Sequence, residues 1–256
     1  MDKSSQGNFA NPPSAWLLHQ WVIAGIVSAS TRFIPIPFVD QLIQTQCRRF
    51  AVSTTLSTHE SNIELSELQP YYGSGEGCLT GCLNGAFRVP LKLLIFPFRK
   101  LLSAVTSIRG VPLEIMRMVL LGRTLDRCLR SGALVNKHNS AEITVAQTAT
   151  HMRQAFDQAF DRMDIKVIQA AIKDALSGVT ALQATAAASL KRAVHRDSQA
   201  LQEVQSDATV EAEADRVQAA LDQPDVLALF SEFDRRFDQF LTESKSAATS
   251  PSRLER

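Results

Sequence analysis

Apolar residues recur at helical spacing along most of the chain, and this pattern predicts a protein built from helices. The first predicted helix, Ser14–Arg32, is apolar on nearly every side, as expected when neighbouring helices cover it. The alternating prolines in residues 33–38 (Phe-Ile-Pro-Ile-Pro-Phe) then hold the backbone extended, and a second helix is expected over residues 38–55. A short third helix is predicted near residues 64–69.

Residues 87–130 predict a hydrophobic helical hairpin edged with cations. Its first helix covers Val89–Ile108 with a bend at Pro97, and its second covers Leu113–Arg130, which Gly132 ends. Such a hairpin suits a helix pair lying on an anionic membrane, and equally a bundle core whose arginines reach out to water. For the membrane alternative, the candidate membrane-facing cations are Lys92, Arg99, Lys100, Arg117, Arg123 and Arg127.

The second half of the chain predicts long amphipathic helices. They are expected over residues 143–163, 165–196 and 208–221, and a last helix opens at Pro224. That last helix carries an apolar stripe made of Val226, Leu227, Phe230, Phe233, Phe237, Phe240 and Leu241. The sequence therefore divides into a disordered start (1–13), an apolar basic helical domain (14–132), a linker (133–140), an acidic long-helix region (141–243) and a disordered tail (244–256).

Composition agrees with an all-α fold, a helical bundle with an apolar N-terminal half and long C-terminal helices. The 256 residues hold 11 Gly and 10 Pro, few for a β-sandwich or barrel, which needs such residues at each strand reversal. The net charge of +1 conceals a contrast, because residues 1–138 carry a net +6 and residues 139–256 a net −5. Such a contrast indicates either an anionic surface bound by the first half or an attraction between the two halves.

Glycine and cysteine spacing raises two further possibilities. Gly77, Gly81 and Gly85 recur every four residues, so they either let another helix approach closely or belong to a flexible loop. Cys78 and Cys82 would share a helix face, but no second pair at zinc-finger spacing completes a metal site. We therefore expect no metal and no cofactor.

Acidic residues offer the remaining candidate chemistry. Asp157, Asp161 and Asp164 lie on one side of a predicted helix and would suit a divalent cation. The Phe-Asp-x-x-Phe-Asp pattern of residues 156–161 returns at residues 233–238, with the phenylalanines expected in the core and the aspartates facing outward, as in any amphipathic helix. No metalloprotease helix or nucleophile elbow occurs in the sequence, so we expect no catalytic residues.

Cysteine usage and the N-terminus bear on location. Four scattered cysteines do not form a disulfide framework, which favours a reducing cytoplasm. The apolar part of the first helix is shorter than the roughly 20 residues that span a bilayer, and the residues before it lack the positive charge of a secretory signal. The basic residues are diluted among apolar ones without a dense block or aromatic platform, which argues against nucleic acid.

One segment also resembles a known group of proteins. Ile34-Pro35-Ile36-Pro37-Phe38-Val39-Asp40 and the basic helix after it are similar to the entrance motif of a group of uncharacterised bacterial all-helical proteins, and the likeness extends over roughly residues 20–132. Two differences from that group are visible. The group commonly has a second acid where this chain has Gln41, and its hairpin is more polar than the hairpin of this chain. The resemblance implies an all-α fold and a bacterial cytoplasmic origin, and it implies no catalytic residues.

Together these features predict a non-catalytic scaffold that associates peripherally with the inner face of the membrane. The alternative is a soluble interaction protein or homo-oligomer that uses the phenylalanine stripe and the alanine-rich stretch at residues 181–193. A metal-dependent enzyme built on the aspartate or cysteine clusters is the third possibility.

Overall fold

A computed structural model describes residues 13–31, 39–73, 110–134, 144–176 and 208–249 of the chain. This part contains eight helices and no strands, which confirms the all-α prediction. The elements are α1 (Ala15–Ser30), α2 (Val39–Thr58), α3 (Gln69–Tyr72), α5 (Val111–Arg130), α6 (Val145–Asp161), α7 (Lys166–Ala175), α10 (Ala208–Leu221) and α11 (Pro224–Thr249). None of the described helices is both long enough and apolar enough to span a membrane.

Helix α1 is buried on most of its surface, as its sequence predicted. Ser14 caps it by accepting a hydrogen bond from the Leu17 amide (3.2 Å). From Trp21 to Ser30 every side chain is buried, because α2, α5 and α10 pack around it. Trp21 Nε1 donates to Thr55 Oγ1 (3.0 Å), which satisfies the one polar atom of the indole in the core.

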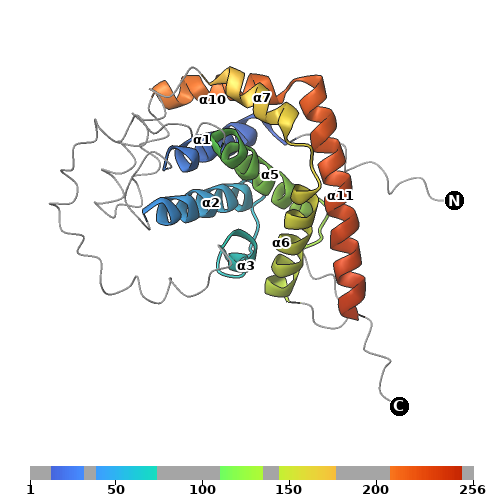
Figure 1. The fold of residues 1–256 in the computed structure, drawn as a ribbon. Coiled ribbons are helices and arrows are strands. Elements are labelled where there is room, and N and C mark those ends of the chain that lie inside the picture. Colours follow the sequence, from blue (N-terminus) through green and yellow to red (C-terminus); the bar gives the residue numbers. More distant parts are fainter. Residues whose placement is uncertain (1–12, 32–38, 74–109, 135–143, 177–207, 250–256) are drawn as a thin grey trace, which may run out of the picture.

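Helix α5 lies at the centre of the bundle and contacts α1, α2, α7 and α11 (Figure 1). The axes of α1 and α5 approach closely at two glycines. A Cβ on Gly25 would lie 2.9 Å from the Ile115 Cα, and a Cβ on Gly122 would overlap the Trp21 ring. Gly132 takes a positive φ of 69° just after the helix, which confirms the predicted end of α5.

The two Phe-Asp-x-x-Phe-Asp segments pack against each other. Phe156 on α6 and Phe233 on α11 meet edge to face with their ring centroids 5.7 Å apart. Most of the phenylalanine stripe is buried here, whereas Leu227 is 43% exposed, contrary to its predicted place on the apolar face. The stripe is therefore core rather than a free docking surface.

The two predicted regions share one core. Buried side chains from α1, α2 and α5 form a single cluster with those from α6, α7, α10 and α11. The predicted linker thus separates two stretches of sequence that pack together, not two separate cores. Most of that linker, residues 135–140, lies outside the described residues, as do residues 1–12 of the predicted disordered start.

Three helix predictions are wrong. The short helix predicted near residues 64–69 instead forms at Gln69–Tyr72 (α3), with Pro70 in its first turn. Helix α11 continues to Thr249, six residues into the predicted tail, and Lys245 in this part donates from Nζ to the Ala133 carbonyl (3.4 Å). Helix α7 ends at Ala175, where Leu176 turns extended (ψ 123°), whereas the apolar pattern predicted a helix to Arg196. The glycine that follows at position 178 is a poor helix former.

Candidate functional site

The sequence singled out six cations and three glycines. Of these nine residues the structure describes three, which are Arg117, Arg123 and Arg127. Lys92, Arg99 and Lys100 lie outside the described residues, and so do Gly77, Gly81 and Gly85. In the described part, the close helix approach expected of those glycines is made by Gly25 and Gly122. An isolated glycine inside a strongly helical pattern is the signal that could have found them.

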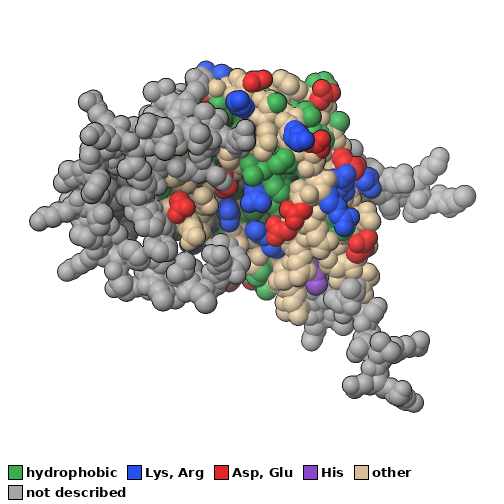
Figure 2. All heavy atoms as spheres, in the orientation of Figure 1, with side chains coloured by type: hydrophobic (Ala, Val, Ile, Leu, Met, Phe, Trp, Pro, Cys, Tyr) green, Lys and Arg blue, Asp and Glu red, His purple; other side chains and the backbone are tan. Residues whose placement is uncertain are grey.

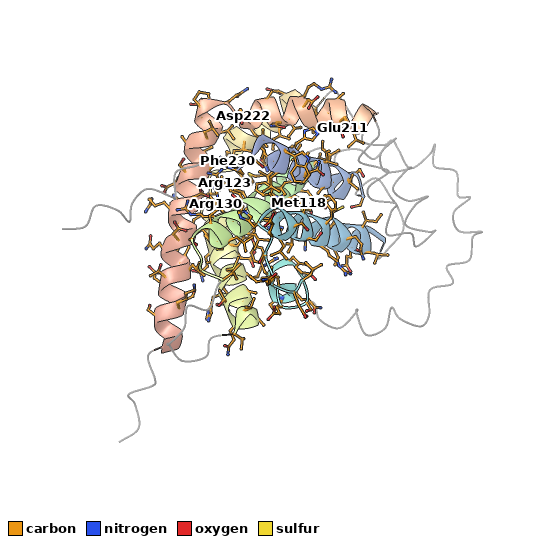
Figure 3. All side chains as sticks on the ribbon, turned by 180° about the vertical axis from the view of Figure 1, so that it is seen from behind. Met118, Arg123, Arg130, Glu211, Asp222 and Phe230 are labelled. Atoms are coloured by element: carbon orange, nitrogen blue, oxygen red, sulfur yellow. The ribbon has the colours of Figure 1, made fainter. Side chains whose placement is uncertain are left out.

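Arg123 and Arg127 pair with acids of the C-terminal half instead of facing a membrane. The Arg123 guanidinium donates to both carboxylate oxygens of Asp234, from Nη2 to Oδ2 at 2.7 Å and from Nε to Oδ1 at 3.1 Å. It also stacks over Phe230, with 5.5 Å from Cζ to the ring centroid (Figure 3). Arg127 Nε donates to Asp238 (3.0 Å), and this hydrogen bond raises the pKa of Arg127. Asp234 is only 6% exposed, so the expectation that it faces outward is wrong.

Arg117 stays at the surface. Its guanidinium lies over the face of Phe160, with Cζ 4.6 Å from the ring centroid. This cation–π contact fixes the side chain through its flat face, so its N–H groups remain available at the edges.

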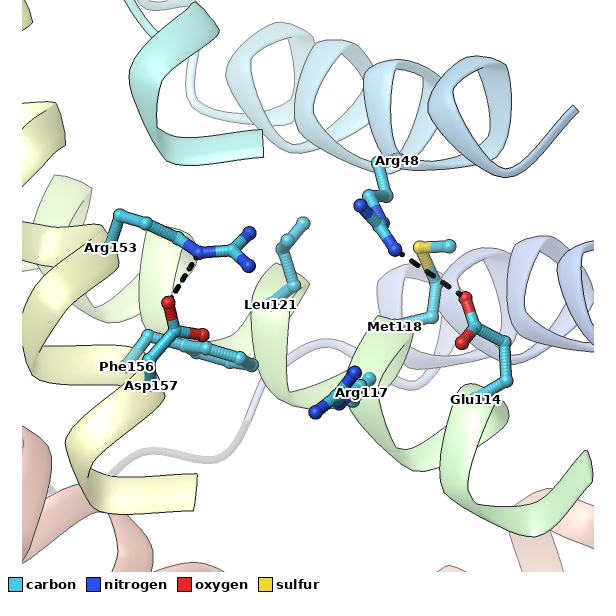
Figure 4. Close-up of a pocket in the computed structure, with 8 residues that line it drawn as sticks. All are labelled: Arg48, Glu114, Arg117, Met118, Leu121, Arg153, Phe156 and Asp157. Atoms are coloured by element: carbon cyan, nitrogen blue, oxygen red, sulfur yellow. Dashed lines mark hydrogen bonds and ion pairs between the residues drawn. The ribbon is translucent and has the colours of Figure 1, made fainter. Parts of the chain in front are cut away.

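A shallow pocket brings Arg117 together with two more arginines (Figure 4). Arg48 reaches in from α2, Arg117 from α5 and Arg153 from α6, while Met118, Leu121 and Phe156 form the apolar floor. Two carboxylates, from Glu114 and Asp157, also line it. Figure 2 shows Lys and Arg side chains gathered near the middle of this face, beside acidic and apolar groups.

Arg48 is the most enclosed of the three cations. Its side chain is 18% exposed, and its nearest carboxylate oxygen, on Glu114, is 3.9 Å away, which is too far for a hydrogen bond. Burial lowers the pKa of Arg48, Glu114 opposes that shift, and the positive charges of Arg153 and Arg117 add to it. The three guanidinium groups are therefore close enough to act on one another.

The other pocket residues are held by hydrogen bonds. Arg153 Nε donates to Asp157 (2.8 Å), and Arg153 Nη1 donates to the Tyr71 carbonyl (3.4 Å). Glu114 is almost fully buried and accepts a hydrogen bond from Ser28 Oγ (2.8 Å). The pocket thus has fixed walls with both charge signs.

Cationic donors outnumber carboxylate acceptors in the lining of the pocket. The enclosed part of the pocket has a volume of about 20 Å³, room for about one water molecule, so a larger group would bind mainly at its mouth. The described thiols offer no nucleophile nearby, because burial raises the pKa of Cys47 and raises that of Cys128 to about 12. Guanidinium groups bind carboxylates and phosphates through paired N–H donors.

The acidic cluster does not gather into a metal site. Asp157 is paired with Arg153, and Asp164 Oδ1 accepts from the Lys166 amide (3.2 Å). In the described ranges no group of three or more His, Cys, Asp or Glu side chains could hold a metal ion. Cys78 and Cys82 lie outside those ranges.

A second polar network ties α5 to the loop after α2. His59 Nε2 lies 2.8 Å from Asp126 Oδ1, and Arg130 pairs with the same carboxylate. Tyr71 on α3 makes a separate contact with α5 by donating to the Leu121 carbonyl (2.7 Å). His59 ties the segment after α2 to this buried acid, and Arg130 pairs with it within α5, so we assign the network a structural role.

The sequence did not predict the arginine pocket. In the sequence Arg48 is one of two adjacent arginines, Arg48 and Arg49, and nothing marks Arg153, because Arg48 and Arg153 are 105 positions apart and belong to different predicted regions. Comparison with protein-family models finds no match for the chain, and neither the curated proteins nor the solved structures give a significant match.

Proposed function

We propose that the protein is a non-catalytic helical scaffold that associates peripherally with an anionic membrane surface on the cytoplasmic side. The observation that carries the proposal is the sequence of residues 89–108, an apolar amphipathic segment with basic residues among its polar positions. Helix α5, the second helix of the predicted hairpin, packs on α1, α2, α7 and α11, so its apolar side chains belong to the core. The membrane contact is therefore assigned to residues 89–108, whose cations and apolar side chains suit an anionic lipid surface.

Charge supports a membrane partner of this kind. Residues 89–108 carry Lys92, Arg99 and Lys100 and no acid, in a segment otherwise rich in Leu, Ile, Val and Phe. Each basic residue near an anionic membrane surface contributes about 1 kcal/mol to binding. Arg123 and Arg127 are not part of this surface, since they pair with α11.

Vesicle sedimentation tests the proposal. We expect the full chain to sediment with phosphatidylcholine vesicles that contain phosphatidylglycerol, and not with phosphatidylcholine alone. The triple variant Lys92→Gln/Arg99→Gln/Lys100→Gln should bind roughly 100-fold more weakly, given three lost cations. The matched control Lys166→Gln/Lys173→Gln/Arg235→Gln removes three exposed cations from α7 and α11 and should bind like wild type. Equal loss in both variants, or no sedimentation of wild type, contradicts the proposal.

A second candidate, self-association or docking of a protein partner, is favoured by one observation. Trp16 at the start of α1 is 56% exposed, the most exposed large apolar side chain in the described part of the chain. The molar mass of wild type and Trp16→Ser by light scattering is the test. A dimer that the variant loses favours this candidate, and a concentration-independent monomer in both counts against a homo-oligomer.

A further inference from the structure

We propose that the pocket between α2, α5 and α6 is a binding site for a phosphate group, held by Arg48, Arg117 and Arg153. The site involves none of the residues 89–108, so it stands independently of the proposed membrane association. Three helices each contribute one guanidinium group, and these groups face a common opening (Figure 4).

The donors of two of these arginines have no carboxylate acceptor. Within the described part of the chain, neither Arg48 nor Arg117 hydrogen-bonds to a carboxylate: Arg48 lies 3.9 Å from Glu114, and Arg117 contacts the Phe160 ring. Each guanidinium has five N–H donors. A charged donor group that is mostly removed from water, as Arg48 is, gains most from an acceptor that carries negative charge.

The site is organised before a ligand arrives. Ser28 fixes Glu114, which lies beside Arg48; Asp157 and the Tyr71 carbonyl fix Arg153. The aromatic face of Phe160 holds Arg117. Binding to side chains that are already positioned loses less conformational entropy, so affinity is higher than for three mobile surface arginines.

Charge and shape favour phosphate over a single carboxylate. The three arginines outnumber the two lining carboxylates, which leaves a net positive charge. A phosphate group presents several oxygens in a tetrahedron, and these can accept from donors that converge from three directions, whereas a planar carboxylate suits one bidentate fork. Because the enclosed volume is only about 20 Å³, the proposal places the phosphorus at the mouth of the pocket, with its oxygens toward the three arginines. Free phosphate and the phosphate of a lipid headgroup share this chemistry.

Thermal unfolding with inorganic phosphate tests the site without vesicles. At constant ionic strength set with chloride, phosphate should raise the Tm of the full chain saturably by about 3 °C. Arg48→Gln and Arg117→Gln should lose this rise, and Arg117→Gln keeps the test valid if Arg48→Gln fails to fold, since Arg117 is exposed. Arg235→Gln, on the exposed side of α11, is the matched control and should keep it.

Two results overturn the proposal. One is the absence of a phosphate-dependent shift in wild type; the other is a shift that Arg117→Gln and Arg235→Gln show equally, which indicates general salt stabilisation. The source of the group is resolved by phosphatidylcholine vesicles that contain phosphatidic acid. If wild type sediments with these vesicles and Arg117→Gln sediments less, the group is a lipid phosphate. If phosphate raises the Tm of wild type but Arg117→Gln does not weaken sedimentation, the group is a soluble phosphate.

Discussion

Helix α5 meets its neighbours in two different ways. Toward α1 the contact is made by shape, since Gly25 lies against Ile115 and Gly122 against the Trp21 ring. Toward α11 it is made by charge, through Arg123 with Asp234 and Arg127 with Asp238. The comparison shows that one helix can be anchored by volume where backbones approach closely and by long side chains where they stand further apart.

The charged contact also explains the contrast between the halves of the sequence. The basic first half and the acidic second half meet at α5 and α11, so part of the opposite charge is used inside the molecule. His19 on α1 adds a further contact between the halves, with Nε2 2.6 Å from Glu211 Oε2 on α10. The Arg123–Asp234 and Arg127–Asp238 pairs show that attraction between the halves, one of the two explanations that the charge pattern allowed, is present.

The largest expected effect breaks the contact made by shape. Gly122→Ala places a methyl group into the buried Trp21 ring, which has no room to move. Overpacking of about 3 kcal/mol or more should outweigh the gain of about 1 kcal/mol in helix propensity. Urea unfolding followed by circular dichroism measures the change.

Two variants control for Gly122→Ala. Gly132→Ala introduces the same methyl group with no atom within 4 Å, so it should cost only the roughly 1–2 kcal/mol of a positive φ. In the Trp21→Leu background, Gly122→Ala should cost much less, because the clash is gone. An unchanged cost in that background means that the Trp21 contact is not the cause.

The next effect breaks the contact made by charge. Asp234→Asn leaves Arg123 without its carboxylate at a mostly buried position, and the free energy of unfolding should fall by about 2 kcal/mol. The double variant Asp234→Asn/Arg123→Met should recover part of the loss, since it removes the unpaired charge. If the double variant loses more free energy of unfolding than the two single variants lose together, Arg123 and Asp234 do not stabilise the fold as a pair.

An alkaline effect should follow from a buried thiol on the charged side of α5. Burial raises the pKa of Cys128 to about 12 from the ordinary 9.0, so its proton is held more tightly in the folded state than in the unfolded one. The resulting stability is complete below pH 9 and is lost as the pH rises toward 12, by roughly 1 kcal/mol at pH 10. Cys128→Ser removes the ionising group and should show a smaller loss of stability between pH 8 and pH 10 than wild type. Parallel pH profiles of the two proteins count against a buried, protonated thiol.

The smallest effect sharpens the comparison within the charged contact. Asp238 pairs with Arg127 but is 45% exposed at its side chain, so water replaces the lost partner in Asp238→Asn. We expect a decrease of only about 0.5 kcal/mol, and less at high salt. A cost as large as that of Asp234→Asn means that burial does not set the strength of these pairs.

Much of the fold was predictable from local pattern, and the site was not. The extents of α1 and α5, the stop at Gly132 and the start of α11 at Pro224 follow from apolar periodicity and from the backbone limits of Gly and Pro. The pocket escaped prediction because Arg48 and Arg153 look like ordinary surface residues on separate helices. Only packing of α2 and α6 on the same side of α5 brings their charges together.

The sequence by itself determined that the described chain is helical, where most of those helices begin, and that its halves carry opposite charge, since these depend on neighbours along the chain. The tertiary structure alone decided that the phenylalanine stripe of α11 is core, that Arg123 and Arg127 face α11, and that three arginines converge. Helix periodicity gives each helix a face but not a partner. The partner depends on the fit of shapes and charges between segments far apart in the sequence.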